Sequence, residues 1–114
     1  MKITDYRFGA IKIDGAQYTK DLIIASGKII DNWWRQEGHQ LQKADIAAIL
    51  EEKPDVLVVG TGYFGRMTIP PETRRTLESH GIVLKAAKTR DAVETFNKLQ
   101  QECARAAAAF HLTC

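Results

Sequence analysis

The segment Asp55-Val56-Leu57-Val58-Val59-Gly60 constrains the fold more than any other part of the chain. Its four central residues are all apolar, so a strand here must be covered by protein on both faces. Pro54 ends the helix before it, in which Ile46, Ile49 and Leu50 share one face, because the proline ring restricts the preceding residue. The pattern predicts the central strand of an α/β sheet.

Two further helices are predicted after this strand. Pro70 and Pro71 open the first helix and Gly81 ends it, and Ile82-Val83-Leu84 is expected to form another buried strand. Thr89 is expected to cap a longer helix, whose apolar stripe comprises Ala92, Phe96, Leu99 and Cys103.

Before residue 40 the sequence is typical of β-hairpins. Asp14-Gly15 joins an alternating segment, Ile11 to Ile13, to a return strand at Gln17-Tyr18. Ser26-Gly27 joins residues 22–25 to residues 28–30 in the same way. We expect these N-terminal hairpins to form a small antiparallel sheet.

The end of the chain is open to two interpretations from the residues alone. Ala104 to Ala109 has high helix propensity and favours an extension of the last helix. Phe110-His111-Leu112-Thr113 alternates like a strand, and one helix from Arg90 to His111 would be unusually long for a small domain.

Composition limits the classes of function. The chain has 114 residues, 45% of them hydrophobic, which fits one compact domain over residues 1–114 and excludes a disordered chain. Its 16 basic and 14 acidic side chains give a net charge of +2, which is not typical of a nucleic-acid-binding protein. Without an import signal or a long apolar segment, we expect a cytoplasmic protein that is not inserted in a membrane, with Cys103 and Cys114 reduced.

Gly60-Thr61-Gly62-Tyr63-Phe64-Gly65 matches the dinucleotide-binding pattern, but its context does not. Residues 66–71 intervene before a helix, and Leu84-Lys85-Ala86 offers no carboxylate for a ribose. We therefore interpret the loop as a structural turn. The alternative is a small-anion site at the carboxyl edge of the sheet, and its candidate ligand-binding residues are Thr61, Gly62, Arg66, Thr68, Lys88, Thr89 and Arg90.

Neither a catalytic constellation nor a metal site is predicted. Cys103, His111 and Cys114 are close in sequence, but their spacing matches no zinc pattern, and no cofactor is expected. Asp21 and Asp31 are interpreted as turn residues.

Trp33-Trp34 is the other notable motif. Adjacent side chains in an extended segment face opposite sides, so one ring should pack into the core while the other stays near the surface. The exposed ring either forms part of a protein interface or covers the hairpin layer.

Several segments together resemble the adipogenesis-associated domain family, which includes the mitochondrial complex I assembly factor three and bacterial and archaeal members known as a domain of unknown function. The segments are Trp34-Arg35 with Gly38-His39, residues 56–62, His80-Gly81-Ile82, Thr89 with Ala92, Phe96-Asn97 and Leu99, and residues 110–114. The resemblance implies a three-layer α/β fold with a central mixed sheet and a C-terminal strand that ends in Thr113-Cys114. It supplies no catalytic residue or cofactor.

Two functions follow from these observations. The first is a non-catalytic interaction domain, similar to an assembly factor, that binds a protein partner through Trp33 and Trp34. The second is a small-ligand-binding protein or an enzyme of unassigned activity that uses the candidate anion site.

Overall fold

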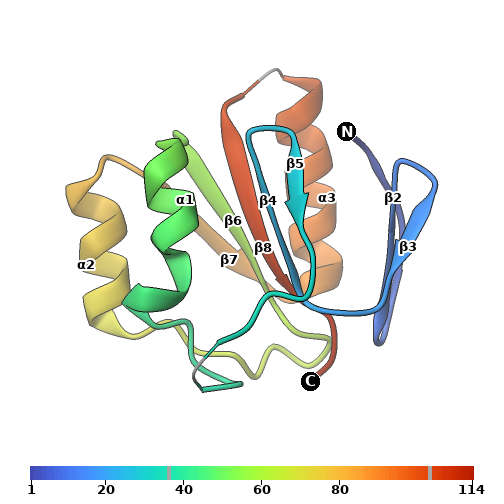
Figure 1. Cartoon of the computed structure of the whole chain (residues 1–114), viewed down its shortest axis with the longest axis horizontal. Coiled ribbons are helices and arrows are strands. Elements are labelled where there is room, and N and C mark those ends of the chain that lie inside the picture. The colour runs from blue at the N-terminus through green and yellow to red at the C-terminus, as the bar shows by residue number, and fades with distance from the viewer. Residues whose placement is uncertain (36, 103) are drawn as a thin grey trace.

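The computed structural model describes residues 1–35, 37–102 and 104–114. Figure 1 shows two sheets and the helices that accompany them. The strands are β1 (Ile3–Arg7), β2 (Ala10–Ile13), β3 (Ala16–Tyr18), β4 (Leu22–Ala25), β5 (Lys28–Ile30), β6 (Val56–Thr61), β7 (Val83–Ala87) and β8 (Ala106–His111). The helices are a 3₁₀ turn η1 (Lys43–Ile46), α1 (Ala47–Glu52), α2 (Pro71–Ser79) and α3 (Thr89–Gln101).

The central sheet is mixed, with the strand order β5-β4-β8-β6-β7. β6 runs parallel to β7 and β8, and β4 runs antiparallel to β8. The prediction of a central strand after Pro54 is confirmed, since Leu57, Val58 and Val59 are fully buried. The prediction that the strand after Gly81 is buried was wrong: β7 lies at the edge of the sheet, and Val83 is 56% exposed.

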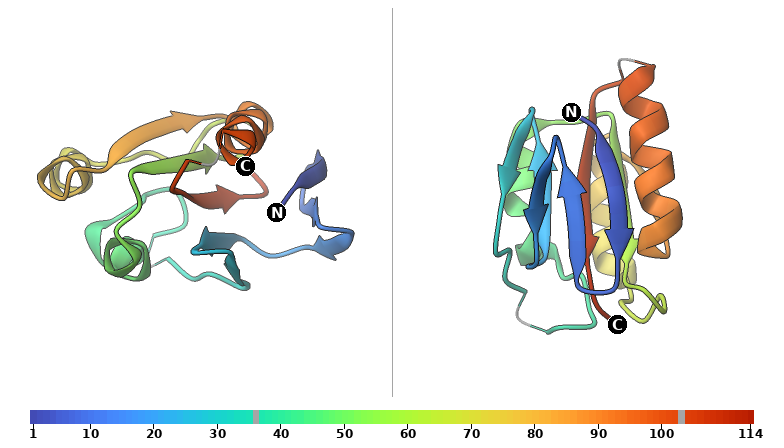
Figure 2. Two further views of the ribbon diagram at one scale, coloured as in Figure 1. Left: turned by 90° about the horizontal axis from the view of Figure 1, so that it is seen from above. Right: turned by 90° about the vertical axis from the view of Figure 1, so that its right-hand side faces the viewer.

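Alternate residues of the central strands enter two different cores. Leu57 and Val59 of β6 face the core beneath η1, α1 and α2, whereas Val58 faces the core beneath α3 and the N-terminal sheet. β8 repeats this alternation, because Ala107 and Ala109 face the first core and Ala108 and Phe110 face the second. The predicted three-layer α/β architecture is therefore confirmed, as the left view of Figure 2 shows.

The two predicted hairpins form, but they belong to different sheets. β1, β2 and β3 make a separate antiparallel sheet, whereas the β4–β5 hairpin joins the central sheet through β8. A small N-terminal antiparallel sheet forms as expected, but the second hairpin is not part of it. Leu22 to Ala25 is buried on both faces, and only a central position satisfies such a strand. Asn97 of α3 ties the N-terminal sheet down by bonding the amide and carbonyl of Ile3 at 2.9 and 2.7 Å.

The alanine-rich segment near the end of the chain is a strand, β8, so the C-terminal strand that the family resemblance implies is confirmed. Its run of small residues has high helix propensity, but Ala107 to Phe110 are all buried between β4 and β6, and tertiary burial outweighs propensity. The strand ends at His111, before the expected Thr113-Cys114. The predicted cap was also wrong, because the N-cap residue of α3 is Lys88 and it makes no side-chain cap bond.

Across the described ranges, the helices are too short and too polar for any of them to span a bilayer.

Candidate functional site

The carboxyl ends of β6 and β8 lie at one end of the molecule, which we call the carboxyl end (Figure 1). β6 connects to β7 through α2, which covers one face of the sheet. β7 then connects back across β6 to β8 through α3, which covers the other face. The direction in which strands are added to the sheet therefore reverses here. Open α/β sheets place their binding sites at such a reversal point. The β1–β2 turn, residues 31–35 and 37–42 and the last residues of the chain all lie at this end (Figure 1).

Three aromatic rings and two guanidinium groups form an exposed cluster at the carboxyl end. Phe8 lies 5.7 Å from Tyr63 and 6.2 Å from Phe64 between ring centroids, and the last two rings lie 5.1 Å apart. The guanidinium groups of Arg66 and Arg90 each lie 5.6 Å from a ring centroid, over Phe64 and Tyr63 respectively. We call these five residues the aromatic–arginine surface.

The two phenylalanine rings of this surface are unusually exposed, and the tyrosine ring beside them is partly exposed. Phe64 is 55% exposed, Phe8 is 50% exposed and Tyr63 is 36% exposed. A contiguous group of large apolar side chains on a surface usually marks a contact site for another molecule.

The predicted anion-site residues lie near one another, but most of their polar groups already have partners. Thr61 donates to the carbonyl of Ala87 at 3.0 Å, and Thr68 donates to the carbonyl of His39 at 3.2 Å. Thr89 is buried, accepts the Gly62 amide at 2.9 Å and donates to the His111 carbonyl at 2.6 Å.

The basic members of that set are exposed, but the guanidinium groups of Arg66 and Arg90 lie over aromatic rings. Lys88 runs beside Gly65, where an added Cβ would lie 3.1 Å from the lysine Cγ. The small-anion site therefore stays a prediction.

The glycines of the predicted turn are explained by space and backbone conformation. Gly62 has φ +108°, and an added Cβ would lie 2.6 Å from the carbonyl oxygen of Cys114 and 2.8 Å from the imidazole of His111. Gly60 permits close packing, because a Cβ there would lie 2.8 Å from both Phe110 and the Thr89 hydroxyl.

A group of buried and half-buried ionisable side chains lies behind the aromatic–arginine surface, and we call it the charge cluster. It consists of Asp21, Arg35 and His111. Oδ2 of Asp21 lies 2.8 Å from Nη2 of Arg35 and 2.8 Å from Nδ1 of His111, and its Oδ1 accepts the Leu112 amide at 2.8 Å. Interpretation of Asp21 as a turn residue was therefore wrong. Asp31 accepts the amide of the next residue at 2.8 Å, where the chain bends, and its role in a turn stays a prediction.

The charge cluster determines the tautomer of His111. Its Nδ1 lies 2.8 Å from the Asp21 carboxylate, which only accepts, and 3.1 Å from Nη2 of Arg35, which only donates. Because Nη2 also reaches Asp21 and the Gly38 carbonyl, we assign the Nδ1 proton to the bond with Asp21. Burial raises the pKa of Asp21, but the bonds from His111 and Leu112 and the nearby positive charges outweigh it, so the net pKa is lowered.

Three buried nitrogens of the charge cluster have no hydrogen-bond partner within the described ranges: Nε and Nη1 of Arg35 and Nε2 of His111. An unpaired buried polar group costs about 1–3 kcal/mol. For Arg35 this cost is partly offset because its guanidinium lies 4.8 Å from the ring centroid of Trp33.

The charge cluster holds the end of the chain against the aromatic–arginine surface. Leu112 is bonded to Asp21 through its amide, while its carbonyl accepts the Gly9 amide at 2.9 Å. The Thr113 carbonyl accepts the Tyr63 amide at 2.7 Å. The last residues of the chain therefore fix both loops that carry the exposed rings.

The two tryptophans are placed as predicted, one packed and one exposed. Trp33 packs against the first core and donates from Nε1 to the carbonyl of Asp45 at 3.1 Å. Trp34 is 80% exposed and precedes Arg35, whose guanidinium pairs with Asp21 in the charge cluster.

No group of three or more histidine, cysteine, aspartate or glutamate side chains arranged to hold a metal ion occurs in residues 1–35, 37–102 and 104–114. Cys103, which the sequence analysis considered together with His111 and Cys114 as a possible metal ligand, lies outside the described residues.

The family model described as a protein of unknown function (DUF498/DUF598) matches residues 3–111. The chain belongs to this family. A conserved hypothetical protein from Pyrococcus horikoshii has 31% sequence identity and a TM-score of 0.78, with 100% of each chain covered. A protein from Bordetella parapertussis has 26% identity and a TM-score of 0.82, covering 96% of this chain and 92% of its own.

A third structure is described as an outer membrane protein from Bartonella henselae, with 26% identity, a TM-score of 0.83 and coverage of 98% and 94%. These comparisons place the chain in a family whose function is not established, and they give no evidence of catalysis.

Sequence reasoning missed the charge cluster of this DUF498/DUF598 family member. Asp21, Arg35 and His111 are 14 or more positions apart in the sequence, and only the pairing of β4 with β8 brings the first and last together. A usable signal was present, since Trp34-Arg35 and residues 110–114 both carried the family resemblance.

Proposed function

We propose that this family member is a non-catalytic protein-interaction domain, similar to an assembly factor, that binds its partner through the aromatic–arginine surface. The observation that carries the proposal is the mutual contact of three exposed rings, with centroids 5.1 to 6.2 Å apart, beneath two guanidinium groups. Tyrosine, phenylalanine and arginine are enriched in protein interfaces, and the residues that dominate binding energy are drawn largely from aromatic and arginine side chains.

The backbone that carries two of the rings is held in place before any partner binds. The Tyr63 amide is bonded to the Thr113 carbonyl, and Phe8 precedes Gly9, whose amide is bonded to the Leu112 carbonyl. A contact surface that is already ordered loses less conformational entropy on binding. This rigidity favours an interaction surface over a flexible loop that exposes its rings by chance.

The charges of the surface favour an acidic partner. Within the described ranges, neither Arg66 nor Arg90 forms a salt bridge, so both guanidinium groups are free to pair with carboxylates. We therefore propose a partner protein with an apolar anchor flanked by aspartate or glutamate. Trp34, which is 80% exposed and adjacent to Arg35 of the charge cluster, would extend this contact.

The finer resemblance agrees with this role. The segments Trp34-Arg35, His80-Gly81-Ile82 and 110–114 resemble the adipogenesis-associated domain family, with its mitochondrial complex I assembly factor. We propose a cytoplasmic location for the interaction.

The proposal is tested by capture from cells of the source organism with matched variants. The surface variant carries Phe64→Ala and Arg66→Ala, and the control carries Ile30→Ser, which alters an exposed apolar residue of β5, 42% exposed. We expect one partner to be captured by the wild-type chain and the control, and to be lost from the surface variant while its melting temperature stays close to wild type. Capture of the same proteins by all three would overturn the proposal.

A further inference from the structure

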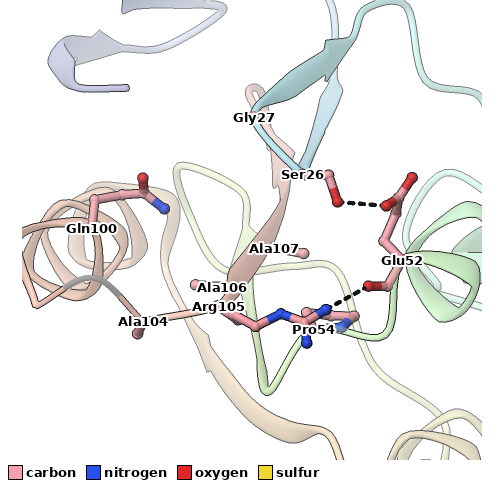
Figure 3. Close-up of a pocket in the computed structure, with 9 residues that line it drawn as sticks. All are labelled: Ser26, Gly27, Glu52, Pro54, Gln100, Ala104, Arg105, Ala106 and Ala107. Atoms are coloured by element: carbon pink, nitrogen blue, oxygen red, sulfur yellow. Dashed lines mark hydrogen bonds between the residues drawn. The ribbon is translucent and has the colours of Figure 1, made fainter.

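A cleft of about 210 Å³ lies at the start of β8, at the opposite end of the central sheet from the carboxyl end. Figure 3 shows the residues that line it. It opens between the β4–β5 turn, the end of α1 and residues 104–105, which precede β8. Its lining residues are Ser26, Gly27, Glu52, Pro54, Gln100, Ala104, Arg105, Ala106 and Ala107.

The hollow follows from the sequence of β8. The strand begins with alanines, and its floor at Ala106 and Ala107 has no side chain beyond Cβ. α1 ends at Glu52 and α3 ends at Gln101, so neither helix covers the start of the strand. Small residues beneath two helix ends leave an open space.

Opposite charges border this cleft without neutralising each other. The Glu52 carboxylate accepts the Ser26 hydroxyl, and Arg105 donates from Nη2 to the backbone carbonyl of Glu52 at 3.2 Å (Figure 3). Within the described ranges, no salt bridge joins the Glu52 carboxylate to the Arg105 guanidinium. Gln100 extends from α3 on the opposite side of the cleft (Figure 3).

We propose that the cleft binds small zwitterions of the α-amino acid class. The carboxylate of the ligand pairs with the remaining N–H groups of Arg105, and its ammonium group pairs with the Glu52 carboxylate. Guanidinium–carboxylate pairs supply geometric specificity as well as energy. The volume of 210 Å³ is below the roughly 300 Å³ at which pockets for drug-sized ligands begin, so the cleft suits a ligand, or part of one, of a few heavy atoms.

Glycine is the probe that tests this proposal, because it carries both charges and no side chain. Backbone amide resonances of the isotope-labelled full chain are followed as glycine is added to about 50 mM, far enough to detect millimolar binding. Acetate and methylammonium, each carrying one of the two charges, are titrated at the same ionic strength. We expect saturable shifts at Gly27, Ala106 and Ala107 with glycine, and at most weak, non-saturating shifts with either half of the molecule.

Matched variants separate the cleft from general charge effects. Glu52→Gln and Arg105→Gln are each expected to weaken glycine binding by about tenfold or more, whereas Glu51→Gln, an exposed carboxylate that does not line the cleft, should leave it unchanged. The absence of saturable shifts with glycine, equal shifts with acetate or methylammonium, or undiminished binding in both cleft variants would each overturn the proposal. None of these outcomes bears on the proposed protein contact at the carboxyl end.

Discussion

Replacement of Asp21 by asparagine tests the charge cluster directly. The side chain keeps its size but loses the negative charge that lies 2.8 Å from both Arg35 and His111. The Arg35 side chain is only 4% exposed, so its guanidinium would be left buried beside a neutral amide. The substitution therefore breaks a buried ion pair by removing one partner.

The expected loss follows from these contacts. Breaking a buried ion pair on one side costs about 3–5 kcal/mol. Because the Asp21 side chain is 18% exposed and an amide oxygen still accepts one hydrogen bond, we take the lower limit, about 3 kcal/mol. At roughly 4 °C per kcal/mol for a domain of this size, the melting temperature should fall by about 12 °C.

Scanning calorimetry at neutral pH, supported by urea unfolding, measures this change. Asp31→Asn is the matched control, because that carboxylate is exposed and accepts only the amide of the next residue. Its melting temperature should change by less than about 2 °C. Equal, small shifts in the two variants would refute the argument that the charge cluster holds the carboxyl end together.

Three further predictions follow from the same contacts. The pKa of Asp21 is lowered in the folded state, so its contribution to the free energy of unfolding is complete above the unfolded value near 3.8. That contribution is lost as the pH falls through the folded value. Urea unfolding between neutral pH and pH of about 3 should therefore show a smaller loss of stability with acid in Asp21→Asn than in the wild type. Gly62→Ala should cost about 2–4 kcal/mol in urea unfolding, because its Cβ would lie 2.6 Å from a carbonyl oxygen, whereas Gly27→Ala, with a positive φ but nothing within 4 Å, should cost only about 1 kcal/mol. Thr89→Val should lose about 1–3 kcal/mol of the free energy of unfolding by the same measurement, since it leaves the Gly62 amide and the His111 carbonyl without this partner. Thr95→Val, which removes an exposed hydrogen bond, should be nearly neutral, and equal effects of the two substitutions would contradict this account.

Local sequence patterns correctly predicted the central strand and the two hairpin turns, because the apolar or turn-forming residues of each element lie next to one another in the sequence. The apolar run before Gly60 required cover on both faces, and the turns at Asp14-Gly15 and Ser26-Gly27 have residues with positive φ at both positions. The edge position of β7 could not be obtained in this way, because Ile82-Val83-Leu84 has the same composition as a buried strand. Only the strand order shows that one of its sides is unpaired.

The candidate site was predicted in part. Arg66 and Arg90 were expected at the carboxyl edge, and they lie there, but the sequence did not indicate that Phe8 and Tyr63 would come to lie beneath or beside them. Phe8 belongs to the β1–β2 turn, which packs against the end of the chain through Gly9. A contact between residues more than fifty positions apart depends on tertiary structure and leaves no local periodicity.

The central claim is that the aromatic–arginine surface contacts a partner protein. A photoreactive phenylalanine analogue placed at Phe64, which is 55% exposed, tests this in intact cells, with the same analogue at Ile30, 42% exposed on β5, as the reference position. The account predicts a covalent adduct at position 64 that contains a different, acidic protein and is missing at position 30. No adduct at position 64, the same adducts at both positions, or an adduct only with a second copy of this chain would contradict it.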